Sequence, residues 1–576
     1  MAGTNSNGDR ADRTTLVAAL SSPDAYAHDV EQPIQVIETH ISHLFLTGEY
    51  AYKVKKPVNL GFVDYSTLDL RRRFTELEFE LNRQISPDVF LGIEPVVALP
   101  DGGFRVGGEG NPVEFALKMR QLSANRTFSN LLENDEIGPG EIRDVALLVA
   151  RFHSAADAMD ADSPLGGVEA MREVTADNLS VMGRFVGVTS DEDDLDDVSA
   201  YTSAFLDVNS DLLESRKAQG FVCDCHGDLH AGNLFLDHDG IHVIDRIEFN
   251  DRFRFIDVAS DLAFLAMDLN HAGRGDLADV LIDSYVDETG DTGLPALLPF
   301  YVMHRSCVRC KVTSLLLDDQ GEISESRRQE IIREASSYGL LAADTVASER
   351  PQAVYLMSGL MGSGKSTMAD ELSRRWGLER FTSDVVRKTL VGIDPQRVSD
   401  EDRREELYAT EMSDRTYAEM IRLGGDALER GCSVLLDAAF IKRHHRADAL
   451  VLAKDQGVPL YIVEVRAPDP VALARLRQRY ESGESPSDGK PELLAWHRSE
   501  LEPVSPEEAD GHIVVENSGT IRDGAIDVLN KLWRVLLQHQ PEQPRSVERP
   551  KRPPRHRLLH PTSLVRIRDP GRVCLR

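Results

Sequence analysis

One glycine-rich stretch, Gly359-Leu-Met-Gly-Ser-Gly-Lys-Ser366, limits the fold of this chain more than any other segment. It fits the spacing G-x-x-x-x-G-K-[ST] at every fixed position, after an apolar run that predicts a strand and before a run that predicts a helix. Glycines there let backbone N–H groups turn inward around phosphate oxygens, and the helix N-terminus adds the positive end of its dipole. We expect Lys365 to reach the β- and γ-phosphates of a nucleotide and Ser366 to hold Mg²⁺. The residues expected to bind ATP here are Gly359, Gly362, Ser363, Gly364, Lys365, Ser366 and Thr367.

Further apolar runs alternate with helical stretches after this loop. They are "SVLLDAAF" (433–440), "LYIVEVRA" (460–467) and "HIVVENSG" (512–519), and the alternation predicts a parallel α/β sheet. Asp437 ends the first of these strands, where an acid can hold Mg²⁺ through water. Taken alone, an acid at a strand end is often only a helix cap, but its place beside a phosphate loop favours the metal role.

The segment "FTSDVVRKTL" lies between these elements and carries Asp384 and Arg387. Because the two are three residues apart, they share a face at the start of a helix. Asp384 could take a proton from an acceptor hydroxyl, and Arg387 could hold an anionic acceptor. The competing interpretation is an N-terminal helix acid beside an exposed arginine.

A second dense polar stretch, "CHGDLHAGNLFL" (225–236), occurs earlier in the chain. His226, Asp228 and Asn233 have the spacing of a kinase catalytic loop, in which the Asp faces the acceptor hydroxyl and the Asn faces a metal on the nucleotide phosphates. The following run, "IHVIDRIEF", contains Asp245, an acid placed to hold the same Mg²⁺. These residues predict a second site for phosphate, metal and hydroxyl.

Two other interpretations of this stretch stay open. His226 and His230 could bind a metal by themselves, although the glycines and flanking strands argue against a helix that would place them on one face. The loop could also be purely structural. Elsewhere, Cys307 and Cys310 form a lone C-x-x-C without a second pair at zinc spacing, which favours a coincidence within a helix.

The motif "CHGDLHAGNLFL…VIDRIEF" resembles the aminoglycoside phosphotransferase (choline-kinase-like) superfamily, which shares the His-Gly-Asp and the second histidine. In that pattern Asp257 and Asp261 fit structural acids downstream of the metal-binding Asp. The stretch 38–74 is similar to a bacterial branch of the superfamily in which the kinase-like domain is fused to a P-loop kinase domain. The resemblance covers about 31–535 and implies small hydroxylated metabolites, sugars or aminocyclitols as substrates, with ATP and Mg²⁺ as cofactors.

The phosphate loop followed by Ser-Asp-x-x-Arg resembles the polynucleotide-kinase-like and gluconate-kinase-like P-loop kinases (AAA_33), over roughly 352–535. This resemblance implies that Asp384 acts as the base and that Arg387 contacts the acceptor. It also implies that Arg475 and Arg479, one helical turn apart in "VALARLRQRY", stabilise the transferring phosphoryl group from a lid. Plain surface arginines are the alternative for that pair.

The resemblance to kinases further implies a lysine on the third strand of a small lobe, which would contact the α- and β-phosphates. Lys53 and Lys55 both qualify, on one face of the strand within the predicted hairpin 43–58, and we prefer Lys53. Its acidic partner is expected on the following helix (71–85), where Glu78 fits best and Glu76 is the second choice. Solvated strand lysines are the alternative, and no G-x-G-x-x-G precedes them.

The predicted fold class is an α+β protein-kinase-like bilobal domain followed by an α/β P-loop NTPase domain with a parallel sheet. The predicted limits are a disordered lead (1–30), the kinase-like domain (31–347), a linker (348–352), the P-loop kinase domain (353–538) and a basic Pro/Arg-rich disordered tail (539–576). The acidic stretch "TSDEDDLDDV" (189–198) is expected to be a solvated loop.

Bulk composition narrows the class of function. The net charge of -31 argues for solubility and against general nucleic-acid binding. No apolar run reaches the roughly 18 residues of a membrane span, and the polar N-terminus lacks the apolar core of a signal peptide. Scattered cysteines suit a reducing cytoplasm.

We therefore expect a cytoplasmic enzyme with two ATP-dependent phosphotransferase domains, each acting on a small-molecule hydroxyl. The alternatives are a C-terminal domain that works as a regulatory ATPase switch, an N-terminal domain that only binds nucleotide, and a polynucleotide kinase.

Overall fold

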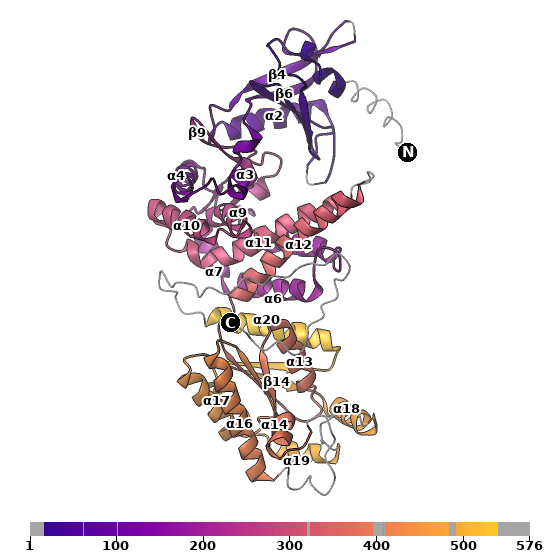
Figure 1. Ribbon diagram of the computed structural model, residues 1–576, viewed down its shortest axis with the longest axis vertical. Coiled ribbons are helices and arrows are strands. Elements are labelled where there is room, and N and C mark those ends of the chain that lie inside the picture. Colours follow the sequence, from indigo (N-terminus) through magenta and orange to yellow (C-terminus); the bar gives the residue numbers. More distant parts are fainter. Residues whose placement is uncertain are drawn as a thin grey trace. The chain divides into compact units, whose positions relative to one another are not determined.

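The computed structural model describes residues 16–539 except 62, 101, 319–322, 395–406, 408 and 483–490. The chain divides into two compact units, one made of Met1–Val174 with Asp211–Arg305 and the other of Thr175–Ser210 with Ser306–Arg576 (Figure 1). The boundaries between these units do not coincide with the expected linker 348–352. The domain limits given above remain a prediction. The expected tail from 540 onward lies outside the described residues.

The first unit opens with an antiparallel sheet of the order β1-β2-β3-β6-β4-β5. Its strands are β1 (Gln35–Glu38), β2 (Ser42–Leu46), β3 (Tyr50–Lys55), β4 (Phe90–Ala98), β5 (Phe104–Val106) and β6 (Pro112–Arg120). The predicted hairpin 43–58 is confirmed by β2 and β3, and the predicted helix 71–85 by α2 (Leu68–Asn82). The Thr67 hydroxyl caps α2 by accepting a hydrogen bond from the N–H of Leu70.

Part of the expected N-terminal lead belongs to this lobe. Leu20, Ala25 and Tyr26 are buried and pack with Phe45 and Tyr52 of the sheet. A short 3₁₀ turn, η1 (Pro23–Ala25), lies between them. The prediction of a disordered lead is therefore wrong for residues 16–30, because apolar residues there pack into the core; residues 1–15 lie outside the described part.

The remainder of the first unit is mainly helical. It contains η2 (Ala124–Arg126), α3 (Phe128–Glu133), α4 (Pro139–Ala155), α7 (Ser210–Ala218), η3 (Ala231–Asn233), α8 (Asp251–Arg254), α9 (Val258–His271) and α10 (Gly275–Thr289), whereas α5 (Val168–Gly183) and α11 (Leu294–Leu315) have residues in both units. Two small antiparallel sheets accompany these helices: β7 (Val222–Asp224) with β10 (Phe255–Asp257), and β8 (Leu234–Asp237) with β9 (Gly240–Val243).

The second unit is built on a parallel sheet of the order β12-β13-β11-β14-β15, as the alternation of strands and helices predicts. Its strands are β11 (Val354–Ser358), β12 (Glu379–Thr382), β13 (Val434–Asp437), β14 (Leu460–Arg466) and β15 (Gly511–Glu516). The helices around it are α13 (Lys365–Trp376), α14 (Ser383–Leu390), α16 (Thr410–Glu429), α17 (Arg443–Asp455), α18 (Asp469–Ser482), α19 (Leu494–Ser499) and α20 (Ile521–Gln538), with short turns η5 (Pro491–Leu493) and η6 (Pro506–Glu508).

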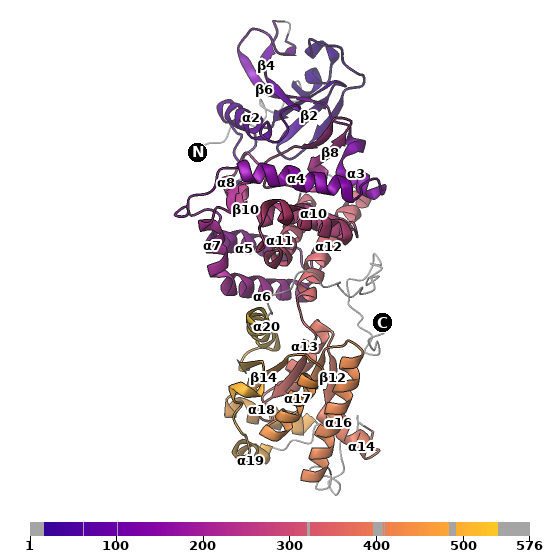
Figure 2. The same ribbon diagram turned by 90° about the vertical axis from the view of Figure 1, so that its left-hand side faces the viewer.

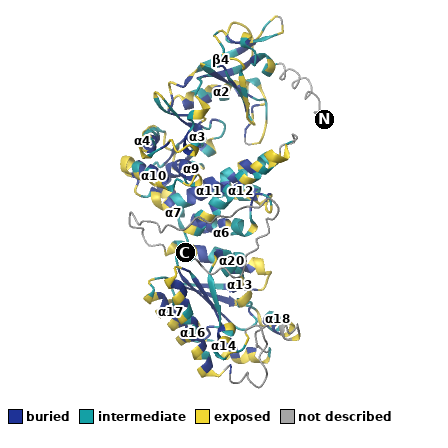
Figure 3. Cartoon of the chain, in the orientation of Figure 1, coloured by how far each residue is buried: buried dark blue, intermediate teal, exposed yellow. Residues whose placement is uncertain are grey.

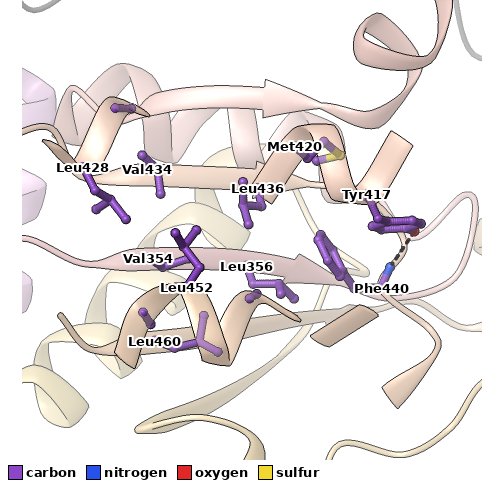
Figure 4. Packing of buried hydrophobic residues seen from close by; sticks show 14 of the residues in the cluster. Val354, Leu356, Tyr417, Met420, Leu428, Val434, Leu436, Phe440, Leu452 and Leu460 are labelled. Atoms are coloured by element: carbon purple, nitrogen blue, oxygen red, sulfur yellow. Dashed lines mark hydrogen bonds between the residues drawn. The ribbon is translucent and has the colours of Figure 1, made fainter. Parts of the chain in front are cut away.

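One core cluster of this unit lies between the sheet and the helices α16 and α17. Figure 4 shows Val354 and Leu356 of β11 beside Val434 and Leu436 of β13, with Leu452 of α17 packed against them. In Figure 3 the strands are dark blue, while α16 and α17 carry yellow outer faces. Truncating such a buried leucine to alanine typically lowers the free energy of unfolding by about 2–5 kcal/mol. Packing of this strength holds the strands in place, and with them the edge of the sheet at which they end.

The second unit also contains helices from outside the P-loop region: α6 (Glu192–Val208), η4 (Leu316–Asp318) and α12 (Glu325–Ser348). Of these, α6 lies alongside α20 (Figure 2). The prediction of a solvated acidic loop at 189–198 is wrong, since most of this stretch begins α6. Asp193 pairs with Arg375 at 2.9 Å, and Asp196 pairs with Arg522 at 3.0 Å. The basic partners lie far along the chain, so local charge patterning could not reveal them.

Asp197 is the most enclosed of these acids. It accepts hydrogen bonds from the indole N–H groups of Trp533 at 2.7 Å and Trp376 at 3.3 Å, and Arg350 lies 3.7 Å away. Burial raises the pKa of this carboxyl, although Arg350 and both indoles oppose the shift. Helix α6 is therefore anchored to α13, the helix that begins at the phosphate loop.

Among the described residues, no helix combines the length and apolarity needed to cross a bilayer.

Candidate active sites

The loop 226–233 of the first unit has a shape that requires glycine at one point. Gly227 has a φ of +87°, and a Cβ there would lie 2.6 Å from the carbonyl oxygen of Phe253. The buried Asp261 accepts hydrogen bonds from the N–H groups of His226 (2.9 Å) and Gly227 (2.8 Å), and it lies 3.0 Å from the Nε2 of His153. Asp261 is thus a structural acid, as the sequence pattern implied.

This loop brings the predicted pair Asp228 and Asn233 together. The Asn233 amide donates to the backbone oxygen of Asp228 at 3.0 Å and to its carboxylate at 3.2 Å. His226 uses both ring nitrogens nearby, one 2.9 Å from the Ile244 carbonyl oxygen and the other accepting the Asp228 N–H at 3.2 Å. The alternative of a histidine metal site therefore has no support in this geometry.

Asp245 follows β9 with a φ of +61°, a left-handed backbone that Asp tolerates better than bulky residues do. Its carboxylate lies 2.6 Å from the Nζ of Lys53, and that same Nζ lies 2.8 Å from Glu78 Oε1. Glu78 contacts Lys53 as expected, but it also contacts Lys55 at 2.6 Å, so the choice of Lys53 stays a prediction; Glu76 pairs with Arg72 on the surface. The roles of these residues in nucleotide and metal binding stay predictions.

Backbone hydrogen bonds join the two halves of this site. The N–H of Ile244 donates to the Asn233 carbonyl at 3.0 Å, and the N–H of Ile247 donates to the His226 carbonyl at 3.1 Å. The segment that carries Asp245 is therefore held against the loop that carries Asp228. Sequence reasoning missed Glu248, which approaches Lys55; the period-two spacing of Lys53 and Lys55 was the available signal.

In the second unit the phosphate loop has the glycine conformations that its motif demands. Gly359, Gly362 and Gly364 have φ values of +136°, +77° and +93°. Cβ atoms at these positions would lie 2.3, 2.6 and 2.2 Å from Val465 O, Ala472 O and Asn517 Nδ2 respectively. Lys365 begins α13 and donates to the Leu360 carbonyl at 3.0 Å, inside its own loop.

The two residues predicted to bind Mg²⁺ in this unit also lie close together. The Ser366 hydroxyl lies 3.5 Å from Asp437 Oδ1, at the end of the buried strand β13. Arg380, which the sequence reasoning missed, donates to the other oxygen, Asp437 Oδ2, at 2.6 Å and to the Ser366 carbonyl at 3.1 Å. Only the pairing of β12 with β13 places Arg380 there, because the two residues are 57 positions apart.

Several further side chains surround the phosphate loop. Arg475 donates to the Ser363 carbonyl at 3.2 Å, and Asn517, which was not predicted, donates to the same oxygen at 2.8 Å. His497 of α19 accepts the Met361 N–H at 3.4 Å; burial and then the charge of Lys365 lower its pKa to about 4. The side chain of Arg479 lies outside the described part of the chain.

Asp384 and Arg387 lie on α14, as predicted, and pair with each other at 3.0 Å. The Arg387 side chain is mostly buried and the Asp384 side chain is partly exposed. Because α14 follows directly on β12, Asp384 comes two residues after the C-terminal end of that strand, and its carboxylate is paired within its own helix. Their roles toward an acceptor stay predictions.

Comparison with known proteins agrees with this architecture. Residues 127–300 match the model of the phosphotransferase enzyme family (APH), and residues 354–504 match an AAA domain (AAA_33). The class is therefore a phosphotransferase-family domain of kinase-like fold joined to a P-loop kinase domain. Uncharacterized proteins of Mycobacterium tuberculosis and Mycobacterium bovis are 30% identical over 434 residues, which is 75% of this chain and 83% of theirs. The chain belongs to the same family as these mycobacterial proteins.

Two solved structures show weaker likeness. A choline/ethanolamine kinase family protein from Mesorhizobium loti is 12% identical, covers 59% of this chain and 98% of its own, and has a TM-score of 0.33. A gluconokinase from Sinorhizobium meliloti is 19% identical, covers 33% of this chain and 96% of its own, and has a TM-score of 0.24. The fold assignment rests on the family matches and on the sheets described above.

Proposed function

We propose that this protein is a bifunctional ATP-dependent phosphotransferase, in which each unit transfers a phosphoryl group to a hydroxyl of a small molecule. A sugar, an aminocyclitol or a similar metabolite is the proposed acceptor class. The observation behind this proposal is that each unit holds an acid suited to Mg²⁺ next to a cation: Asp245 beside Lys53 and Asp437 beside Arg380. In the second unit the Ser366 hydroxyl also lies 3.5 Å from Asp437. Both family matches support phosphotransfer with ATP.

In the first unit, Asp228 orients or deprotonates the acceptor hydroxyl, because the loop fixes its backbone through His226 and Asn233. Lys53 holds the α- and β-phosphates, steadied by Glu78. Asn233 and Asp245 offer the oxygen donors that Mg²⁺ prefers, so the residues fit that ion. Bound Mg²⁺ would neutralise charge on the phosphates; all other work in this site is positioning.

In the second unit, Lys365 and the loop N–H groups hold the phosphates of ATP. Ser366 and Asp437 supply hard oxygen donors that fit Mg²⁺, with Arg380 fixing the far oxygen of Asp437. Asp384 receives the acceptor proton, and Arg387 holds both Asp384 and an anionic part of the acceptor. Arg475 stabilises charge on the transferred group.

A second candidate is favoured by the anchoring of α6 on α13. In it the P-loop domain binds or hydrolyses ATP as a switch, and α13 passes the change to α6 through Asp193 and Asp197. ATP hydrolysis without any acceptor, unchanged in Asp384→Asn, would support this candidate.

The test is a screen of metabolite extracts with labelled ATP, with products identified by mass spectrometry. The full chain is compared with Asp228→Asn, Lys365→Ala and the double variant. We expect each single variant to lose one class of product and the double variant to lose both. The matched controls are Asp283→Asn on α10 and Lys454→Ala on α17, both at exposed positions. They should keep both classes of product. Undiminished products in the double variant would overturn the proposal.

A further inference from the structure

Lys55 has no role in the proposed reaction, yet it lies at the centre of a buried group of charged side chains. Lys55 is buried, and its Nζ lies 2.6 Å from Glu78 Oε2 and 3.3 Å from the Tyr65 hydroxyl, with Glu248 Oε1 also in contact. The Tyr65 hydroxyl donates to the same Glu248 oxygen at 2.5 Å. Three ionised groups and a phenol therefore share one enclosed position.

Lys53 and Lys55 lie on one face of β3 and each contacts two acids. Lys53 contacts Glu78 and Asp245, while Lys55 contacts Glu78 and Glu248. Glu78 is common to both and gives one carboxylate oxygen to each lysine. The other two acids lie three positions apart in the segment after β9. That segment is thus attached to the small-lobe sheet at two points.

The two attachments differ in how far the acid of the later segment is exposed to solvent. The Lys53 contact reaches Asp245, whose side chain is 46% exposed, whereas the Lys55 contact reaches Glu248, whose side chain is 7% exposed. Both lysines contact Glu78 closely: Lys53 Nζ lies 2.8 Å from Glu78 Oε1, and Lys55 Nζ lies 2.6 Å from Glu78 Oε2. Because Asp245 is the more exposed acid, Lys53 can exchange partners more easily than Lys55 can.

Burial would raise the pKa of Glu78, but the charges of Lys53 and Lys55 outweigh it and hold that pKa well below its usual value. Burial and the nearby charge of Glu248 raise the pKa of Tyr65, so the phenol keeps its proton and stays a donor. Ionised acids and a protonated phenol are the forms that this hydrogen-bond network requires.

We propose that Lys55, Glu248 and Tyr65 are positioning residues for nucleotide binding in the first unit, an inference that rests on the function proposed above. They hold Glu78 and the segment 245–248 in place while Lys53 leaves Asp245 for the phosphates and Asp245 turns to the metal. If the buried ion pair of Lys55 with Glu248 were purely structural, apolar groups could replace it without a change in nucleotide affinity.

The experiment measures binding of a non-hydrolysable ATP analogue to the full chain carrying Lys365→Ala, so that only the first unit contributes. Glu248→Gln and Tyr65→Phe are added singly, and the Mg²⁺ concentration for half-maximal binding is recorded with thermal unfolding. We expect weaker binding by about 10-fold or more and a higher Mg²⁺ requirement, because supporting partners of metal ligands typically contribute about 10–100-fold. Lys55→Met is a third variant, and its binding is compared only if thermal unfolding shows that it folds.

Asp291→Asn is the control, since it removes one partner of the buried Arg216 in the helical part of the same unit. It should lower the unfolding temperature without changing the Mg²⁺ requirement. Unchanged affinity and Mg²⁺ requirement in both Glu248→Gln and Tyr65→Phe would overturn the inference. No analogue binding by the Lys365→Ala parent, or full binding when Lys53→Met is added, would instead overturn the proposed function of this site and the inference with it.

Discussion

The two candidate sites differ in how they place the acid that is predicted to bind Mg²⁺ next to a basic side chain. In the first unit, Asp245 lies in an irregular segment with a 46% exposed side chain, and Lys53 reaches it from a sheet 192 positions earlier. In the second unit, Asp437 ends a parallel strand with a 1% exposed side chain, and Arg380 reaches it from the next strand. The first pairing depends on how the lobe is assembled, whereas the second follows from a single sheet edge.

Because of this difference, different substitutions should disrupt the two sites. The second site depends on backbone conformations that one motif specifies, so a local change in the loop should abolish it. The first site depends on ion pairs between segments distant in sequence, so it should respond to supporting residues and to pH.

Gly364→Ala should abolish nucleotide binding by the second unit and leave the first unit active. The added Cβ would lie 2.2 Å from Asn517 Nδ2, at a φ of +93° that L-residues rarely adopt. Gly377→Ala, at the other end of α13, is the matched control: its φ is +66° but nothing lies within 4 Å of the Cβ. The control should cost only about 1 kcal/mol, as strain at an isolated left-handed position does. Equal nucleotide affinity in both variants, by calorimetry, would contradict the local origin of this site.

Asp197→Ala should destabilise the second unit by about 2–4 kcal/mol, because it leaves two buried indole N–H groups and Arg350 without this acid. Denaturant unfolding followed by tryptophan fluorescence measures the change. Asp207→Ala breaks the exposed pair with Arg534 on α6 and α20 and should cost less than about 1 kcal/mol. If both substitutions lower the free energy of unfolding by the same amount, α6 is not anchored through Asp197.

The first unit should lose stability in acid through Asp261. Although burial opposes it, the hydrogen bond and charge of His153 lower the pKa of Asp261 to about 2. Because the folded pKa is depressed, this contribution is complete above the unfolded pKa near 3.9 and is lost as pH falls toward 2. It amounts to about 2–3 kcal/mol. Asp261→Asn should therefore destabilise at pH 6 by more than at pH 2.5. A pH-independent difference in unfolding free energy would refute this.

The smallest effect is expected for Glu76→Gln, which removes the surface partner of Arg72. A pair of this kind on a helix contributes about 0.2–0.5 kcal/mol, and nucleotide affinity should not change. Glu78→Gln, two positions further along α2, should weaken nucleotide binding strongly because it removes the shared partner of both lysines. Reversed effects of these two variants in the binding assay would show that the wrong glutamate was chosen.

The sequence predicted much of this fold because its strongest signals are local. The phosphate loop between strand and helix, the hairpin around β2 and β3, and the parallel alternation after Val354 each depend on residues close together in the chain. The loop 226–233 likewise brings Asp228 and Asn233 together through spacing alone. The pairing of Lys53 with Glu78 came from the resemblance to kinases rather than from spacing.

Glycine positions and residue spacing therefore specify the two loops and the class of fold around each, since they set the local backbone geometry. The partners of Asp437, Lys55 and Asp197, in contrast, are set only by tertiary packing. Arg380 on Asp437, Glu248 on Lys55 and the tryptophans on Asp197 are contacts between residues tens to hundreds of positions apart. A charge pattern read along the chain cannot specify such a partner, because the partner is chosen by how the buried elements pack.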